Sequence, residues 1–197
     1  MPVKQRRGEE TARRLLDAAL AVHEEAGPDG FTVQAVVSAS GVSLGSLYHH
    51  FGSFDGLAAA LYSRCMAELL DGIVASLERS RTARGGVRAV VTAYLRFVEA
   101  EPRQARFIHA SAYASYLPAH VDAIAAMKQP RLARMAHWLA PHVRDGAIVD
   151  LPDPLTEMLL IGPVAELSRR WLAGATDIDL GVAARVLPDR IWASVRK

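Results

Sequence analysis

Apolar residues recur every three or four positions along almost the whole chain, which is the spacing of one face of an α-helix. No stretch alternates apolar and polar residues as a half-buried strand would, and no internal repeat is present. Glycine and proline residues divide the helical pattern into separate segments. The sequence therefore predicts an all-α fold of about nine helices, at about 9–26, 33–40, 44–51, 54–79, 87–98, 102–117, 119–143, 154–172 and 178 or 180–195.

Residues 32–51, TVQAVVSASGVSLGSLYHHF, contain two short helical patterns separated by Gly41. Glycine accommodates the positive φ of a tight turn, and the hydroxyl of Ser43 is suited to cap the amides of a new helix. In the second helix Leu47 and Phe51 lie four residues apart and are expected to face the core. This arrangement predicts a helix-turn-helix. Small, hydroxyl, aromatic and imidazole groups that suit a DNA groove remain on the outward side, at Gly45, Ser46, Tyr48, His49 and His50.

The segment FTVQAVVSASGVSLGSLYHHFGSFDGLAAAL, preceded by ARRLLDAALAVHEEAG, resembles the DNA-binding domain of TetR-family transcriptional regulators. The resemblance covers Thr11 to Leu61 and is most specific in GVSLGSLYHHF. It implies a helix-turn-helix domain at residues 1–54 and a helical ligand-binding and dimerisation domain at 55–197. It also implies a one-component repressor that binds a palindromic operator as a homodimer and is released by a small apolar or aromatic effector.

Two positions depart from the family pattern, since Leu44 and Phe54 stand where the family commonly has lysine. Both differences remove potential phosphate contacts, so the salt dependence of DNA binding is expected to be shallower than in a more basic relative. Recognition then depends more on hydroxyl, aromatic and histidine side chains and on the basic N-terminus. The DNA-binding residues implied are Arg6, Arg7, Thr32, Gln34, Ser43, Leu44, Gly45, Ser46, Tyr48, His49 and His50.

For the C-terminal part, the resemblance implies a ligand pocket and a helical interface between two subunits. Pockets are lined mostly by apolar and aromatic side chains with a few polar groups, which selects Tyr94, Phe107, His109, Tyr113, Met127, Met135, Trp138 and Trp171. The expected dimer interface comprises Leu160, Val164, Leu167, Trp171, Val182 and Val186. Both sets have an alternative interpretation, because residues of these types at helical spacing also form the ordinary core of a single chain.

The part of the chain that is expected to bind DNA does not carry the excess of positive charge. The 197 residues carry a net charge of +2, but residues 1–79 hold seven Lys and Arg against ten Asp and Glu. Residues 80–197 hold 16 Lys and Arg against 11 Asp and Glu, so the excess of positive charge lies in the C-terminal part. Within the acidic N-terminal part, a local basic arm is formed by Lys4, Arg6, Arg7, Arg13 and Arg14.

Other classes of function find little support. Cys65 is the only cysteine, so neither an intrachain disulfide nor a cysteine-cluster metal site is expected. No zinc-protease, phosphate-loop or nucleophile-elbow motif is present, so no enzyme activity, cofactor or metal is expected. The charged N-terminus and the lack of a long apolar run predict a cytoplasmic protein without membrane contact. The alternative function is a helical small-molecule-binding or interaction protein that does not bind DNA.

Three local features carry further expectations. His23 stands where the family usually has an aromatic packing residue, so we expect it in the core or at its boundary. The charged and glycine-containing segment 78–86 is expected to be a linker. Pro130 should either kink or break the helix that contains it.

Overall fold

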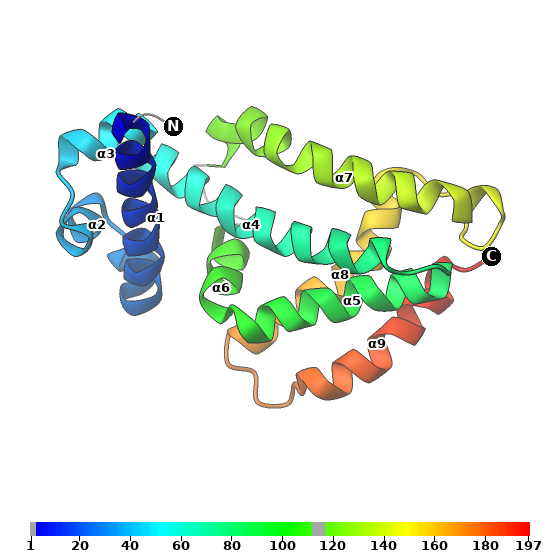
Figure 1. Cartoon of the computed structure of the whole chain (residues 1–197). Coiled ribbons are helices and arrows are strands. Elements are labelled where there is room, and N and C mark those ends of the chain that lie inside the picture. The colour runs from blue at the N-terminus through cyan, green and yellow to red at the C-terminus, as the bar shows by residue number, and fades with distance from the viewer. Residues whose placement is uncertain (1–2, 112–116) are drawn as a thin grey trace. The chain divides into compact units, whose positions relative to one another are not determined.

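The computed structural model describes residues 3–111 and 117–197, and its architecture is all-α (Figure 1). The predicted fold class is confirmed, and the nine α-helices of the described residues match the expected number. One 3-10 turn and one isolated bridge between Ile148 and Arg196 complete the secondary structure of these residues. The elements are α1 (Val3–Gly30), α2 (Val33–Ser40), α3 (Leu44–Phe51), α4 (Phe54–Glu78), α5 (Ala83–Ala100), α6 (Pro102–Ser111), η1 (Pro118–His120), α7 (Val121–Arg144), α8 (Asp153–Leu172) and α9 (Leu180–Val195).

The chain divides into two compact units. The first consists of Met1–Met66 with Arg103–Ala125, and the second consists of Ala67–Pro102 with Ala126–Lys197. Helices α4 and α7 therefore each contribute residues to both units. The functional boundary at residue 54 that the sequence suggested stays a prediction.

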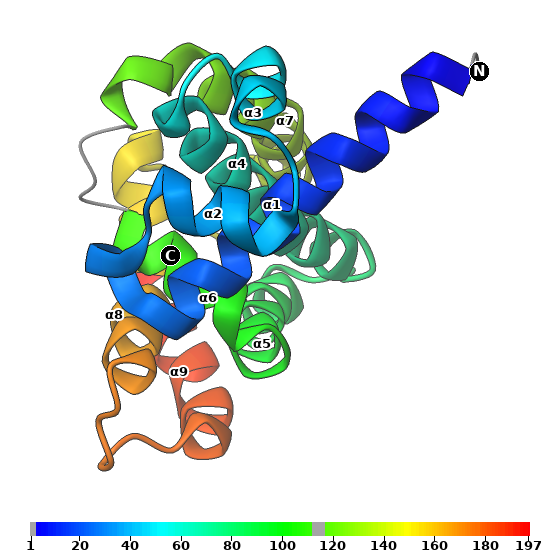
Figure 2. The ribbon, with the colours of Figure 1, turned by 90° about the vertical axis from the view of Figure 1, so that its left-hand side faces the viewer.

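In the first unit α1 packs against α2 and α3, and the N-terminal turns of α1 extend beyond α2 (Figure 2). Helix α1 begins at Val3, several residues before the expected start. At Gly27 the backbone leaves the helical region, with φ 67° and ψ −173°, before one more turn reaches Gly30. Glycine permits this positive φ, so the predicted end of the helix lies at the break. The fully buried core residues include Leu15, Val36, Leu47, Leu57 and Leu61.

An aromatic cluster, formed by His23, Phe31, Phe54 and Phe107 of α6, lies at the edge of this core. The ring centroid of His23 lies 4.8 Å from that of Phe107 and 5.6 Å from that of Phe31, with both pairs edge to face. Phe31 also contacts Phe54 at 4.9 Å. Such edge-to-face pairs are favourable because the ring edge is positive and the ring face negative. The expectation that His23 is a core histidine is confirmed.

Burial lowers the pKa of His23 below its usual value of 6.5, because the charged imidazolium loses solvation among these rings. Well above pH 6.5 the histidine is neutral in both the folded and the unfolded chain, whereas near and below pH 6.5 the unfolded chain binds the proton more readily. We therefore expect the free energy of unfolding to fall between pH 7.5 and pH 5.5. Urea titrations of the wild type and of His23→Phe test this, since the phenylalanine variant should lose part of the decrease. Equal pH dependence in both proteins would contradict it.

In the second unit α5 packs against α8 and α9. The buried residues of α5 follow helical spacing, as the sequence predicted, and include Val87, Val91, Tyr94 and Val98. Asp179 precedes α9 as its N-cap, and its carboxylate accepts a hydrogen bond from the amide of Val182 at 2.8 Å. The last turn of α9 is held by the amide of Val149, which donates to the carbonyl of Val195 at 2.8 Å.

Helix α7 is joined to the C-terminal half of α4 by two arginine–carboxylate pairs. Arg131 donates to both carboxylate oxygens of Asp71, at 2.9 and 2.8 Å, and Arg134 likewise binds Glu78 with two hydrogen bonds. The helix runs continuously through Pro130 and Pro141, so Pro130 does not break it. Both prolines are exposed, where water can satisfy the carbonyl groups that lose their helical partner.

Of the segment expected to be a linker, residues 79–82 connect α4 to α5, whereas residues 83–86 form the first turn of α5. Helix α5 begins at Ala83, and its first turn is capped by the hydroxyl of Thr82, which accepts the amide of Gly85 at 3.1 Å. Gly86 is buried beneath Trp138, whose indole N–H donates to the carbonyl of Ser80 at 3.0 Å. The sequence predicted that Gly86 belongs to a linker, whereas this glycine makes room for an aromatic ring.

Gly86→Ala should therefore destabilise the protein although alanine favours helices. A Cβ at this position would lie 2.0 Å from the indole of Trp138, so the ring would have to move and its hydrogen bond would weaken. We expect a loss of about 1–3 kcal/mol in the free energy of unfolding, which urea titration measures. The control is Gly72→Ala in α4, where an added Cβ would meet nothing within 4 Å. This substitution should raise the free energy of unfolding by about 0.5–1 kcal/mol, because alanine favours helices. A stabilising effect at both positions would contradict the packing role of Gly86.

Candidate nucleic-acid interface

The turn between α2 and α3 is built as the sequence predicted. The hydroxyl of Thr32 accepts the amide of Ala35 at 3.3 Å and caps α2. Gly41 adopts φ 63° and donates its amide to the carbonyl of Val37 at 3.1 Å, which ends α2. The hydroxyl of Ser43 then accepts the amide of Ser46 at 3.2 Å and starts α3. These bonds use amides and carbonyls that helix ends leave without partners, and they fix the direction of α3.

The outward face of α3 carries the predicted contact residues. Leu47 is fully buried and anchors the helix, whereas Leu44 and Tyr48 have 44% and 45% of their side chains exposed. His49 is exposed, and its ring centroid lies 5.3 Å from that of His50, which is half-buried. Gly45 is exposed, and a Cβ there would meet nothing within 4 Å. From α2 and its cap, Thr32 and Gln34 also reach the surface, while Ser46 is half-buried.

The basic arm is partly used inside the first unit. Arg13 forms an ion pair with Glu10, and the hydrogen bond from Arg13 lowers the pKa of that carboxyl. Arg14 donates to the carbonyl of Ser40 at 2.8 Å, next to the turn that precedes α3. Sequence reasoning missed this bond because it joins residues 26 positions apart. Arg6 and Arg7 are exposed in the first turns of α1 and stay candidates for DNA contact.

Residues 15–61 match the model of the family described as "Bacterial regulatory proteins, tetR family". The chain is a TetR-family transcriptional regulator. The helix-turn-helix described above lies inside the matched segment. Because this family consists of DNA-binding transcription regulators, the chain binds DNA and is not an enzyme.

Proteins similar to this chain match it over nearly its whole length. The HTH-type transcriptional regulator BetI from Paraburkholderia xenovorans is 26% identical over 185 residues, which cover 90% of each chain. A TetR family transcription regulator from Marinobacter aquaeolei has the same fold, with a TM-score of 0.80 at 20% identity and coverage of 98% and 99%. FadR from Bacillus subtilis, crystallised in complex with stearoyl-CoA, gives a TM-score of 0.77 at 17% identity, with 93% of this chain and 99% of FadR covered.

In this TetR-family chain the predicted ligand residues fall into different surroundings. Phe107 packs against the rings of His23 and Phe31 in the core of the first unit and is 1% exposed. Trp138 likewise covers Gly86 and bonds Ser80, which gives it a packing role. Phe107 and Trp138 thus have packing roles, and their assignment to a ligand site stays a prediction. Tyr94 is buried, His109, Met127 and Met135 are half-buried, and Tyr113 lies outside the described residues.

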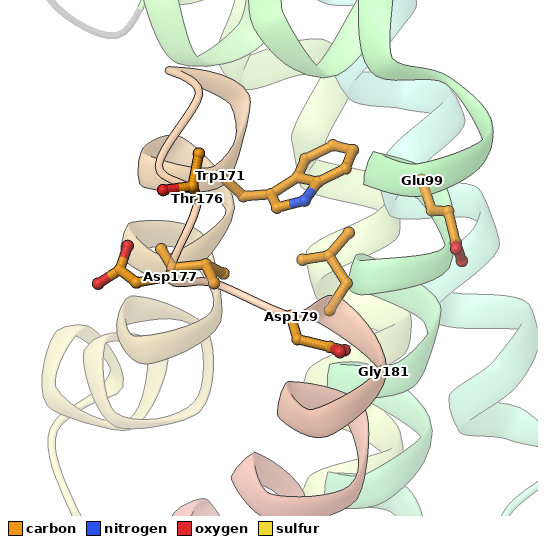
Figure 3. A pocket seen from close by; sticks show the side chains of 8 residues that line it. Glu99, Trp171, Thr176, Asp177, Asp179 and Gly181 are labelled. Carbon is orange, nitrogen blue, oxygen red and sulfur yellow. The ribbon is translucent and has the colours of Figure 1, made fainter.

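Trp171 lines an open depression of about 420 Å³ where α8 turns into α9 (Figure 3). In this view its indole lies between the α8–α9 connection and the side of α5 that carries Glu99. The carboxylate of Asp179 at the rim already caps α9. Among the residues that the structure describes, Trp171 is the only member of the predicted ligand set that lines this depression. Its lining is Glu99, Trp171, Thr176, Asp177, Ile178, Asp179, Leu180 and Gly181.

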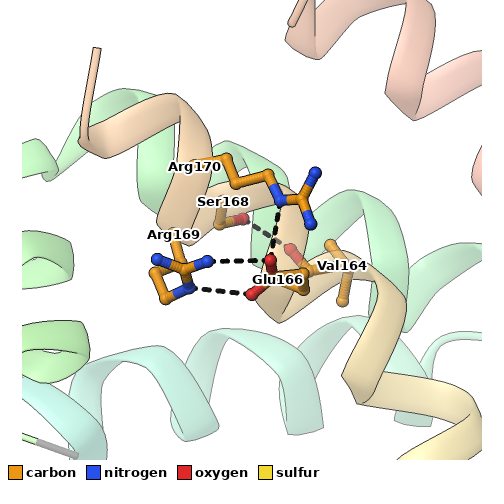
Figure 4. Close-up of polar contacts among 5 residues, drawn as sticks. All are labelled: Val164, Glu166, Ser168, Arg169 and Arg170. Carbon is orange, nitrogen blue, oxygen red and sulfur yellow. Dashed lines mark hydrogen bonds and ion pairs between the residues drawn. The ribbon is translucent and has the colours of Figure 1, made fainter. Parts of the chain in front are cut away.

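Within the predicted dimer stripe of α8, the structure contradicts one residue. Val164 is fully buried by its own chain, so its side chain is not available to a second subunit. Ser168 on the same side is buried too and donates to the carbonyl of Val164 at 2.7 Å (Figure 4). Leu160, Leu167 and Trp171 are half-buried, whereas Val182 and Val186 on α9 are 45% and 49% exposed.

The exposed apolar positions of α8 lie about half a turn away from that stripe, on the opposite side of the helix. Leu155 and Met158 are 48% and 67% exposed, and Gly162 continues their face at i+7 with open space around its Cα. Further along, Glu166 accepts hydrogen bonds from Arg169 and Arg170, which lower its pKa to about 2 (Figure 4). Among the described residues, no helix is long and apolar enough to cross a membrane.

Proposed function

We propose that the chain is a ligand-responsive repressor that binds a palindromic operator as a homodimer and is released by a small apolar or aromatic effector. The observation that carries the proposal is the capped α3, which exposes Leu44, Gly45, Tyr48 and His49 on its outer face. A helix of this kind enters the major groove, where its N-terminal residues contact base edges and phosphates.

Gly45 supports this role because nothing inside the protein explains it. Glycine weakens a helix relative to alanine, and a Cβ here would have open space. A close approach of the DNA backbone to α3 accounts for a glycine at this position. Arg6, Arg7, Thr32, Gln34, Ser43, Ser46 and His50 complete the proposed contact set around it.

Gly45→Ala should then change stability and DNA binding in opposite directions. We expect the free energy of unfolding to rise by roughly 0.5 kcal/mol and operator affinity to fall. Gly72→Ala is the matched control, since it should raise stability in the same way and leave DNA binding unchanged. Fluorescence anisotropy with operator DNA and urea titration measure the two quantities. Unchanged affinity in Gly45→Ala would argue against close approach of DNA at this position.

For dimerisation we propose that the exposed faces of α8 and α9 pair with their copies around a two-fold axis. Leu155, Met158 and Gly162 on α8 and Val182 and Val186 on α9 supply apolar surface that water would otherwise cover. This set replaces the inward stripe around Val164. Two α3 helices related by the axis then require two half-sites with inverted repeats.

The effector is proposed to act by linkage. A compound that binds more tightly to a dimer with mis-spaced α3 helices lowers operator affinity, and operator DNA opposes that compound equally. Half-buried Met127 and Met135 on α7 favour an apolar effector, since methionine adapts to varied apolar shapes. The stearoyl-CoA complex of the structurally similar FadR supports the same class. We place this effector-controlled release from operator DNA in the cytoplasm.

The proposal is tested by selecting duplexes from a random-sequence pool with the full-length protein. We expect an inverted repeat to be enriched, and a complex with two chains per duplex in analytical ultracentrifugation. Failure to enrich any inverted repeat would refute operator binding as a dimer and would favour the alternative of a helical small-molecule-binding protein. Screening acyl and aromatic compounds for release of the selected duplex then tests the effector.

A further inference from the structure

The excess positive charge of the C-terminal sequence gathers at one end of the second unit. Four segments meet there: the α4–α5 connection, the start of α5, the end of α7 and the end of α9 (Figure 1). Eight exposed cations lie on them, and we call these residues the basic surface: Arg79, Arg81, Arg84, Arg88, Arg144, Arg190, Arg196 and Lys197.

Contacts within the unit hold these segments together. Trp138 of α7 bonds Ser80 in the α4–α5 connection at 3.0 Å. The side chain of Lys197 approaches Gly146, two residues after Arg144, and Ile148 pairs with Arg196 in the isolated bridge. Asp189 of α9 accepts hydrogen bonds from Arg84 at 3.0 Å and from Arg88 at 3.1 Å. The cations therefore share one surface, although the sequence places them more than 100 residues apart.

Few carboxylates neutralise this surface. Asp189 is shared by two arginines, and their hydrogen bonds lower its pKa. Glu78 is used by Arg134 of α7. The other carboxylates of this part of the chain are Asp145 and Asp150, which follow α7. Glu78 is not counted because it pairs with Arg134, so the eight cations are accompanied by three carboxylates. Such an imbalance creates a positive potential that attracts polyanions.

We propose that the basic surface binds the phosphate backbone of a second stretch of double-stranded DNA, independently of sequence. Seven of the eight cations are arginines, whose planar guanidinium group binds phosphate oxygens in pairs. None of the large exposed apolar side chains of the described residues lies in these segments. An apolar anchor would be expected for a membrane surface, and an apolar centre for a protein partner. A surface of guanidinium groups alone fits a phosphate backbone best.

The test uses the full-length protein and a labelled duplex of random sequence, in the background of Tyr48→Ala to weaken binding through α3. The variant pair Arg81→Gln and Arg196→Gln removes two exposed cations of the basic surface. The control pair Arg96→Gln and Arg170→Gln removes the same charge elsewhere in the second unit. We expect the first pair to weaken binding about tenfold at about 0.1 M salt. The slope of log affinity against log salt should fall by about 1.8, at about 0.9 per lost phosphate contact.

The control pair should keep both the affinity and the slope. Equal weakening by both pairs would overturn the proposal, because net charge alone would then explain binding. Unchanged DNA binding together with weaker binding to phosphatidylglycerol vesicles would also overturn it, in favour of a membrane surface. Since the duplex is random, absence of an enriched inverted repeat in the operator selection would not affect this result.

Discussion

Tyr48→Ala should lower the affinity for the selected operator by roughly 10- to 100-fold, the range for loss of a side chain that contacts DNA directly. Tyr48 is 45% exposed on α3, and its neighbour Leu47 carries the packing of the helix, so the fold should tolerate the change. Operator titrations by fluorescence anisotropy measure the loss, and thermal unfolding verifies that stability is kept. Affinity within about twofold of the wild type would exclude Tyr48 from the DNA contact set.

Two further variants separate the contributions that side chains on this face of α3 make to operator binding. Tyr48→Phe removes only the hydroxyl group. A loss of operator affinity as large as that of Tyr48→Ala would assign the effect to a hydrogen bond of the hydroxyl, whereas a smaller loss would assign it to the ring. Leu44→Ala shortens the exposed side chain that replaces the family lysine, and we expect it to alter preference at thymine-containing positions. Footprints with an unchanged site preference would remove Leu44 from the specificity set.

Phe107→Ala should reduce the free energy of unfolding by about 3–5 kcal/mol, because it opens a cavity in a core that is otherwise filled. The side chain is 1% exposed and contacts the rings of His23 and Phe31. Urea titration measures this loss. The residue was a ligand candidate in the sequence, so the same experiment separates the two roles: a lost effector response with intact stability would support the ligand assignment.

Phe97→Ala is the matched control for this substitution. Phe97 lies in α5 and is only half-buried, so removing its ring should cost clearly less than removing that of Phe107. Equal losses at the two positions would show that partial burial is enough to explain the effect. A larger contribution of Phe107 to stability through its full burial in the aromatic cluster would then have no support.

Local chemistry was predicted well from the sequence. Thr32, Gly41 and Ser43 act through amides and carbonyls only a few residues away, so their types and spacing determine the helix-turn-helix. The order of the helices and most of their ends follow from apolar spacing in the same way. Helix α1 is longer than expected because its first turns are polar and carry no apolar pattern.

Contacts across long sequence separations were not predictable. Gly86 was assigned to a linker because nothing near it in the sequence indicates its contact with Trp138. Val164 was assigned to a dimer interface because periodicity identifies an apolar face and does not reveal which surface covers it. The bond between Arg14 and Ser40 and the gathering of the basic surface also depend on packing. Charge counts alone revealed an excess in the C-terminal part but not its location.

Helix α6 has a consequence for protein engineering. Residues 103–111 belong to the same compact unit as α1, α2 and α3, and Phe107 reaches His23 and Phe31 from there. Arg103 and Arg106 also form ion pairs with Glu24 of α1. A fragment that ends at residue 66 would expose these rings to water. The DNA-reading module is therefore not portable as an N-terminal fragment, and a chimaera would have to graft α6 together with α1–α3.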